Sequence, residues 1–115
     1  MHQSVNAETG KKIQELQVFE QQLQQGALQK QTVQVELNEV INALTEISKT
    51  KDEVYRLIGG IMVRADQELL AKELTEKKRI LEIRIQALEK QETLIEDKIK
   101  KLREEINLVV KAVKK

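Results

Sequence analysis

An apolar segment at the midpoint of the chain, residues 54–65, constrains the fold more than any other feature. It consists of two five-residue runs, VYRLI and IMVRA, joined by Gly59-Gly60. Valine, isoleucine and tyrosine favour strands, and two glycines supply the positive φ angles that a type I′ turn needs. The segment therefore predicts a β-hairpin. Because a lone hairpin is marginally stable in water and this one is apolar on both faces, we expect it to pair with strands of other chains.

A long helix is predicted before the hairpin, over residues 11–48. Apolar residues recur there alternately three and four apart, and eight of the ten residues at these positions are apolar. This spacing is typical of the a/d seam of a coiled coil rather than of a helix in a globular core. The seam consists of Leu16, Phe19, Leu23, Gly26, Lys30, Val33, Leu37, Val40, Leu44 and Ile47.

A second long helix is predicted after the hairpin, over residues 67–114, with Asp66 at its N-cap position. Ten of its twelve seam residues are apolar. On its outer positions Glu73 and Lys77 form a favourable i,i+4 pair. The seam consists of Leu74, Lys78, Leu81, Ile85, Leu88, Glu92, Ile95, Ile99, Leu102, Ile106, Val109 and Val113.

The hairpin reverses the chain, so the two seams are expected to pair antiparallel. When Ile47 is placed level with Leu74, Lys30 falls level with Glu92. A single polar layer of opposite charges in an apolar seam is a known way to set the register. The alternative is that each of these two side chains extends separately to water.

The composition agrees with a mostly α fold in one domain, residues 1–115: a long antiparallel two-helix coiled coil with one central β-hairpin. Of the 115 residues, 34% are charged and none is proline, and Phe19 and Tyr55 are the only aromatic residues. Few large rings argue against a compact core, whereas this charge content is typical of long helices.

The same composition excludes several classes of function. A net charge of +1 provides no field for nucleic acid, and a chain without cysteine has neither a disulfide nor a thiolate metal site. No apolar run approaches the ~18 residues of a membrane span, so we expect no membrane partner and a cytoplasmic location. There is no Gly-rich phosphate loop, and the carboxylates lie on solvated helix faces. We therefore expect no catalytic, cofactor-binding or metal site, and no enzyme activity.

The open end of the predicted coil carries more apolar residues than a seam uses. Leu108, Val109 and Val110 are consecutive, Val113 follows, and Val18 lies off the first seam. Exposed apolar patches usually mark interaction sites. The alternative is that the helix ends fray and have no role.

Basic residues become more frequent toward the C-terminus. Two interpretations remain open: a solvated face with favourable charge at a helix C-terminus, or an electrostatic docking site for an acidic partner. These residues are Lys98, Lys100, Lys101, Arg103, Lys111, Lys114 and Lys115.

The order helix, apolar hairpin, helix resembles the β-type subunit of prefoldin, and the resemblance covers nearly the whole chain. Its most specific part is the segment VYRLIGGIMVR at 54–64, which looks like the hairpin of that family. The stretch IRIQALEKQE at 83–92 and the Gln-rich stretch FEQQLQQ at 19–25 are similar to its second and first helices. Only one hairpin is present, whereas the α-type subunit of the family carries two.

The resemblance implies an ATP-independent chaperone without a cofactor, assembled as a hexamer of two α-type and four β-type subunits. Its hairpins would join in an inter-subunit β-barrel, and its coils would capture unfolded polypeptides near their tips and deliver them to a group II chaperonin. The assembly residues would be Val54, Tyr55, Leu57, Ile58, Gly59, Gly60, Ile61, Met62 and Val63. The client-binding residues would be Ile13, Leu16, Val18, Phe19, Leu108, Val109, Val110 and Val113. The chaperonin-docking residues would be Lys111, Lys114 and Lys115. The alternative function is a structural coiled-coil scaffold, or a filament-forming homo-oligomer, without client transfer.

Overall fold

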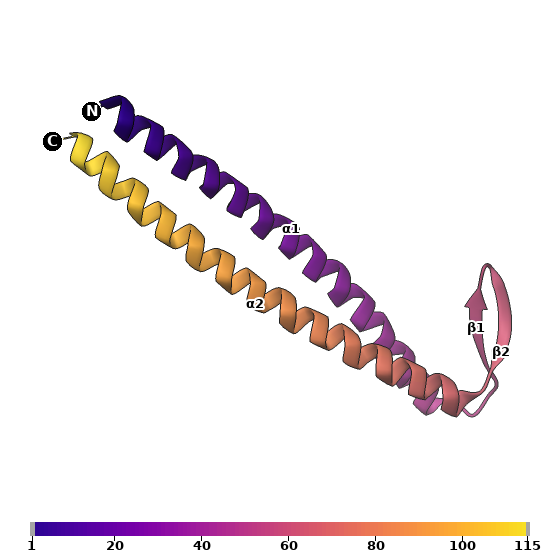
Figure 1. Ribbon diagram of the computed structural model, residues 1–115. Coiled ribbons are helices and arrows are strands. Elements are labelled where there is room, and N and C mark those ends of the chain that lie inside the picture. Colours follow the sequence, from indigo (N-terminus) through magenta and orange to yellow (C-terminus); the bar gives the residue numbers. More distant parts are fainter. Residues whose placement is uncertain (1, 115) are drawn as a thin grey trace. The chain divides into compact units, whose positions relative to one another are not determined.

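The computed structural model describes residues 2–114, and the side chains of residues 7–112. Along the chain the elements are α1 (His2–Lys49), β1 (Val54–Ile58), β2 (Ile61–Ala65) and α2 (Gln67–Lys114), as Figure 1 shows. The predicted class, mostly α with one central hairpin, is confirmed. Helix α1 begins at His2, well before the predicted start at Lys11. Residues 2–10 carry no seam pattern, which is why the sequence did not predict a helix there. They contain no proline, so nothing in them prevents the helix from extending to His2.

The chain divides into two compact units. The hairpin unit comprises residues 31–86, and the terminal unit comprises residues 1–30 together with 87–115. Within each unit a segment of α1 runs beside a segment of α2 in the opposite direction (Figure 1).

The core of the hairpin unit consists of aliphatic side chains at the predicted seam positions. Val33 and Leu81 are each 4% exposed, and these are the lowest values among the buried side chains. Burying an aliphatic side chain of this size contributes about 1.5–3 kcal/mol. The buried residues of this unit are Val33, Leu37, Val40, Ile47, Leu70 and Leu81.

The terminal unit has a thinner core, formed by Ile95, Ile99 and Leu102 with half-buried partners on α1. Gly26 stands at a seam position of α1, and a Cβ there would meet no atom within 4 Å. Within residues 7–112, every predicted seam side chain of both helices is buried or half-buried, so the two predicted seams are confirmed.

The predicted starting layer of the register is wrong in the hairpin unit. The Gln67 side-chain amide donates a hydrogen bond to the Ile47 carbonyl at 2.6 Å, so Ile47 lies against the first turn of α2. Gln67 precedes Leu74 by about 10 Å along the helix axis. Leu70 lies one turn nearer to this contact than Leu74 does and is 8% exposed, so it belongs to the core at this end of the unit. The predicted seam of α2 lacks Leu70 because the connections to the hairpin are shorter than that seam assumes.

The start of α2 is capped as the sequence predicts. The Asp66 carboxylate accepts a hydrogen bond from the Leu69 backbone N–H at 3.0 Å. This satisfies one of the N–H groups that the first turn of a helix leaves without an intrahelical partner. The helix therefore begins directly after β2, and the connection between hairpin and coil is short.

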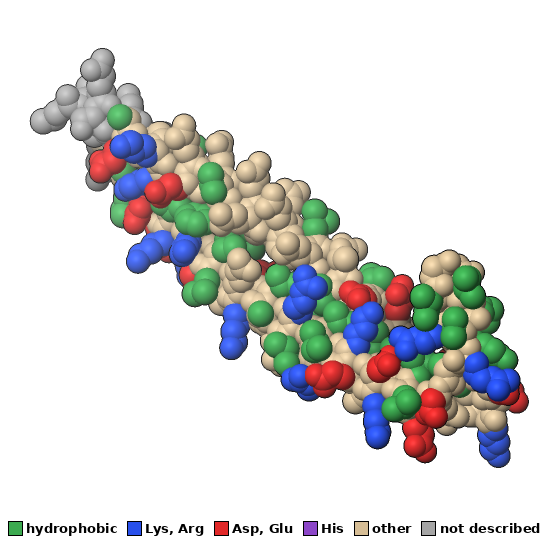
Figure 2. All heavy atoms as spheres, turned by 45° about the vertical axis from the view of Figure 1, so that its right-hand side comes forward, with side chains coloured by type: hydrophobic (Ala, Val, Ile, Leu, Met, Phe, Trp, Pro, Cys, Tyr) green, Lys and Arg blue, Asp and Glu red, His purple; other side chains and the backbone are tan. Residues whose placement is uncertain are grey.

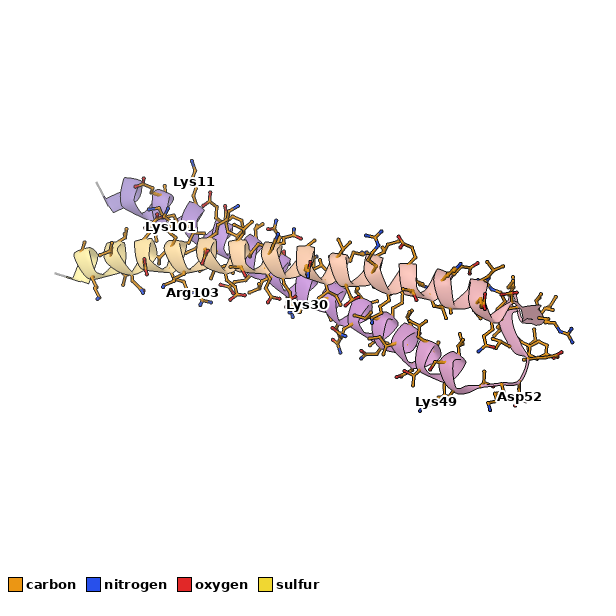
Figure 3. The ribbon with its side chains drawn as sticks, turned by 90° about the horizontal axis from the view of Figure 1, so that it is seen from below. Lys11, Lys30, Lys49, Asp52, Lys101 and Arg103 are labelled. Atoms are coloured by element: carbon orange, nitrogen blue, oxygen red, sulfur yellow. The ribbon has the colours of Figure 1, made fainter. Side chains whose placement is uncertain are left out.

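In the terminal unit, Lys30 and Glu92 form the predicted polar layer. The Lys30 Nζ and Glu92 Oε2 atoms are 3.5 Å apart, and the two side chains are 33% and 29% exposed. Figure 3 labels Lys30 on α1. Their contact confirms that these two opposite charges in the seams meet, and it excludes the alternative that each extends separately to water.

This pair is expected to favour a defined register at a cost in stability. Replacing both residues by leucine, Lys30→Leu with Glu92→Leu, should raise the free energy of unfolding by about 1–2 kcal/mol, because two half-buried charges no longer need desolvation. Denaturant unfolding of the native assembly measures the change. Swapping the charges, Lys30→Glu with Glu92→Lys, is the control and should preserve stability, whereas either reversal alone should lower it. If the effects of the two single reversals were additive, the pair would contribute nothing.

Candidate interaction surfaces

The hairpin closes through a tight turn at Gly59 and Gly60. Their φ angles are +55° and +81°, a region that glycine occupies without steric cost. The strands pair antiparallel with Tyr55 opposite Arg64, Leu57 opposite Met62, and Ile58 opposite Ile61. Opposite residues project from the same face, so both faces of the ribbon carry large apolar side chains.

These apolar side chains are exposed in the single chain. Leu57 is 71% exposed and Met62 is 69% exposed on one face, and Ile58 and Ile61 are 55% and 66% exposed on the other. Figure 2 shows several hydrophobic side chains, in green, on the surface of the hairpin. An exposed strand pair with free edges is a template for pairing with further strands. We call the residues Val54, Tyr55, Leu57, Ile58, Ile61, Met62 and Val63 the hairpin surface.

A small polar network stiffens the base of the hairpin. Its centre is the Glu53 carboxylate, which accepts hydrogen bonds from the Tyr55 hydroxyl at 2.8 Å and from Arg64 Nη2 at 2.9 Å. Tyr55 and Arg64 are cross-strand partners, so one carboxylate holds both strands. On the same segment, Arg56 Nη1 lies 2.9 Å from Glu73 Oε2 of α2. No pattern in the sequence predicted Glu53 and Arg56 as residues that position the hairpin.

The charged pairs on the helices differ in part from the sequence prediction. Glu73 contacts Arg56 and Lys77 contacts Glu36 of α1 at 3.2 Å, so the predicted pair of Glu73 with Lys77 is wrong. Both residues instead join separate elements of the hairpin unit. On α2 the Arg79 guanidinium donates hydrogen bonds to the Glu76 carboxylate, which lowers the pKa of Glu76 below its ordinary value. The side chains of that pair are exposed, and the pair lies at no candidate site.

The predicted client-binding residues divide into exposed and seam side chains. Ile13 and Val18 of α1 are 41% and 50% exposed, and Leu108 and Val110 of α2 are 69% and 42% exposed. We call these four residues the terminal surface. Leu16, Phe19 and Val109 are half-buried in the seam instead. The side chain of Val113 lies outside the described part of the chain.

Phe19 is covered on one side by a cation. The Lys98 Nζ atom lies 5.3 Å from the centre of the Phe19 ring, within the range of a cation–π contact. Lys12 and Glu105 also bridge the two helices of this unit at 3.5 Å. Nothing in the spacing of the sequence indicated the contact between Lys98 and Phe19.

The predicted docking lysines lie mostly beyond the described side chains. Lys111 is exposed, the Lys114 side chain is not described, and Lys115 lies outside the described residues. Within residues 2–114, no helix is long and apolar enough to span a membrane. Among the side chains of residues 7–112, no group of three or more Asp or Glu residues is placed to hold a metal ion.

Comparison with known proteins identifies the family. The family model described as "Prefoldin subunit" matches residues 10–112. Proteins named "Prefoldin subunit beta" from Pyrococcus furiosus and Thermococcus onnurineus are 40% and 38% identical over 99 residues, which cover 84% of this chain and 85% of each relative. The crystal structure of the prefoldin beta subunit from Thermococcus strain KS-1 superposes with a TM-score of 0.79 at 37% identity, covering 86% of this chain and 89% of that one. The chain therefore belongs to the prefoldin family of chaperone subunits, among its β-type members.

Proposed function

We propose that this protein is a subunit of an ATP-independent holdase, which captures unfolded polypeptides at the terminal surface and delivers them to a group II chaperonin. The observation that carries the proposal is the exposure of Ile13, Val18, Leu108 and Val110 in the outer parts of the two helices. Leu28 and Leu94 of the same unit are also exposed, but they lie farther from the helix ends. Exposed apolar side chains that lie near one another can bind the apolar segments of other chains.

The hairpin surface supports the proposed assembly. Its side chains are apolar on both faces and remain 43–71% exposed from Leu57 to Val63, apart from the Gly59-Gly60 turn. Burial of these side chains between subunits would close the hairpins into an inter-subunit β-barrel, which removes the free strand edges. The assembly would be a hexamer of two α-type and four β-type subunits in the cytoplasm. Several copies of a weakly apolar terminal surface would then act together on one unfolded chain.

The lysines Lys111, Lys114 and Lys115 remain our proposal for the contact with the chaperonin. The exposed Lys111 supports an electrostatic contact that steers association more than it sets affinity. The competing proposal is a scaffold or a filament-forming homo-oligomer without client transfer. Suppression of aggregation and the mass of the assembly, measured with and without an α-type partner, separate these possibilities.

Replacing Leu108 and Val110 with serine tests capture. The double variant should keep the mass of the natural assembly, because both side chains are exposed and outside the seam. It should need about tenfold more protein to suppress aggregation of a denatured client, since partial burial of two aliphatic side chains is worth roughly 1.5 kcal/mol. Light scattering of a diluted, denatured client measures this.

The matched control is Ile83→Ser with Leu94→Ser on the same helix. These side chains are 51% and 62% exposed and belong to neither surface. The control should suppress aggregation like the natural chain. Equal loss in control and test variants would mean that general apolar exposure, and not the terminal surface, binds the client.

A further inference from the structure

A groove runs along the terminal unit between α1 and α2. It has a volume of about 1480 Å³ and opens to solvent along its length. Its floor is apolar, because Ile99 is 5% exposed and Leu23 is half-buried beneath it. Figure 3 labels Arg103 on the α2 side of this unit. The groove lies apart from the four residues of the terminal surface except for Val18, which lines its rim.

Four glutamines form the α1 wall of the groove: Gln14, Gln17, Gln21 and Gln24. Their spacing of three, four and three residues places them on one side of the helix. All four side chains are exposed, and none of their amide groups makes a hydrogen bond within the described residues. A glutamine amide carries both a donor and an acceptor, as does a peptide group. The glutamines of this wall can therefore donate to and accept from the N–H and C=O groups of a polypeptide backbone that is not yet paired in secondary structure.

The α2 wall carries an excess of negative charge. Arg103 is neutralised by Glu20 of α1, with Nη2 and Oε1 3.7 Å apart. Among the remaining lining charges, three are acidic and one is basic, and none of the four forms an ion pair within the described residues. These charges are Glu96, Asp97, Lys100 and Glu104. The groove is thus complementary to a basic occupant.

The length of the groove matches a short extended segment. On α1 its lining extends from Gln14 to Ala27, which at 1.5 Å per residue is about 20 Å. An extended chain advances about 3.3 Å per residue, so about six residues fit. A folded domain has already paired its backbone groups and would gain little from a row of side-chain amides.

We infer that this groove binds an extended segment of an unfolded polypeptide in which Lys or Arg alternates with aliphatic residues. The glutamines pair with the backbone of the segment, and the floor takes its aliphatic side chains. The alternate Lys or Arg side chains start on the outward face, and their long stems bend so that the charges reach the acidic α2 wall. This assignment rests on the proposed function and specifies the class of segment that the chaperone prefers.

Fluorescence anisotropy of labelled eight-residue peptides with the complete native assembly tests the assignment. One peptide alternates valine and lysine, and the other alternates valine and glutamate. The lysine peptide should bind at least tenfold more tightly at low salt, and added salt should reduce this ratio. Glu96→Gln, Asp97→Asn and Glu104→Gln together should remove the preference for lysine.

Replacing Gln17, Gln21 and Gln24 with alanine should weaken binding of the lysine peptide about tenfold. Alanine favours helix more than glutamine does, so the coil should persist. The matched control replaces Gln22, Gln25 and Gln29, three exposed glutamines of the same helix that lie outside this groove. The control should bind like the natural chain.

Equal binding of the two peptides by the natural assembly, or unchanged binding by the glutamine variant, would overturn the groove assignment. The proposed function fails by a different result, namely that the natural assembly does not suppress aggregation at all. If Leu108→Ser with Val110→Ser reduces suppression while the glutamine variant binds peptide normally, only the groove assignment is wrong.

Discussion

Leu57→Ser together with Met62→Ser should dissociate the native assembly while leaving the helices folded. These two residues are cross-strand partners on one face of the hairpin and are the two most exposed apolar side chains of that ribbon. Their loss costs almost nothing in a single chain, because exposed side chains away from special features change stability by about 0.5 kcal/mol or less. Buried between subunits, the pair would be worth about 3–6 kcal/mol per copy. Assembly should therefore weaken by at least about 100-fold.

Native mass spectrometry of the mixed assembly and circular dichroism of the same sample measure these two effects. The matched control is Val35→Ser with Ile83→Ser, two helix residues that are 53% and 51% exposed and lie outside the hairpin surface. That variant should keep the natural mass. An intact assembly with the Leu57 and Met62 substitutions would show that the hairpin surface does not join subunits.

Leu81→Ala is expected to be the most destabilising single change in the coil. Leu81 is 4% exposed in the core of the hairpin unit, so its truncation removes buried apolar area and leaves a cavity. Substitutions of this kind lower the free energy of unfolding by about 2–5 kcal/mol. Thermal unfolding followed by circular dichroism at a fixed protein concentration measures the loss.

The neighbouring residue provides the control. Ile80 is 51% exposed, so Ile80→Ala removes a side chain of the same size from a position that faces water. It should change the free energy of unfolding by about 0.5 kcal/mol or less. Similar losses at both positions would mean that α2 does not pack with the face that carries Leu81.

Much of the fold could be predicted because it follows from two sequence periods. The alternation of three and four residues identified both seams, and the strand-forming runs around Gly59-Gly60 identified the hairpin. The alignment of α1 with α2 was harder to predict. A seam repeats every heptad, so sliding one helix along the other by a heptad again pairs apolar residues with apolar residues. Lys30 and Glu92 were informative since they break this repeat. Leu70 was missed because its burial depends on how tightly the connections fold.

The candidate surfaces were predicted less completely. The sequence indicates which tip residues are apolar, but Leu16, Phe19 and Val109 also belong to the seam and are half-buried. The contact between Arg56 and Glu73 depends on the angle of the hairpin to α2, which no local pattern encodes. The row of glutamines is visible in the sequence, whereas the acidic wall facing it requires the pairing of the two helices.

The antiparallel pairing also affects the order in which the chain can fold. Contacts in the hairpin unit, such as Gln67 with Ile47, join residues close in sequence, so little loop entropy is lost when they form. Contacts in the terminal unit, such as Lys12 with Glu105, join opposite ends of the chain and close the longest loop. We therefore expect the contacts between α1 and α2 to form first beside the hairpin and then progressively toward the two ends of the chain. Amide hydrogen exchange should accordingly be slowest around Val40 and Leu81 and become progressively faster toward Ile13 and Leu108.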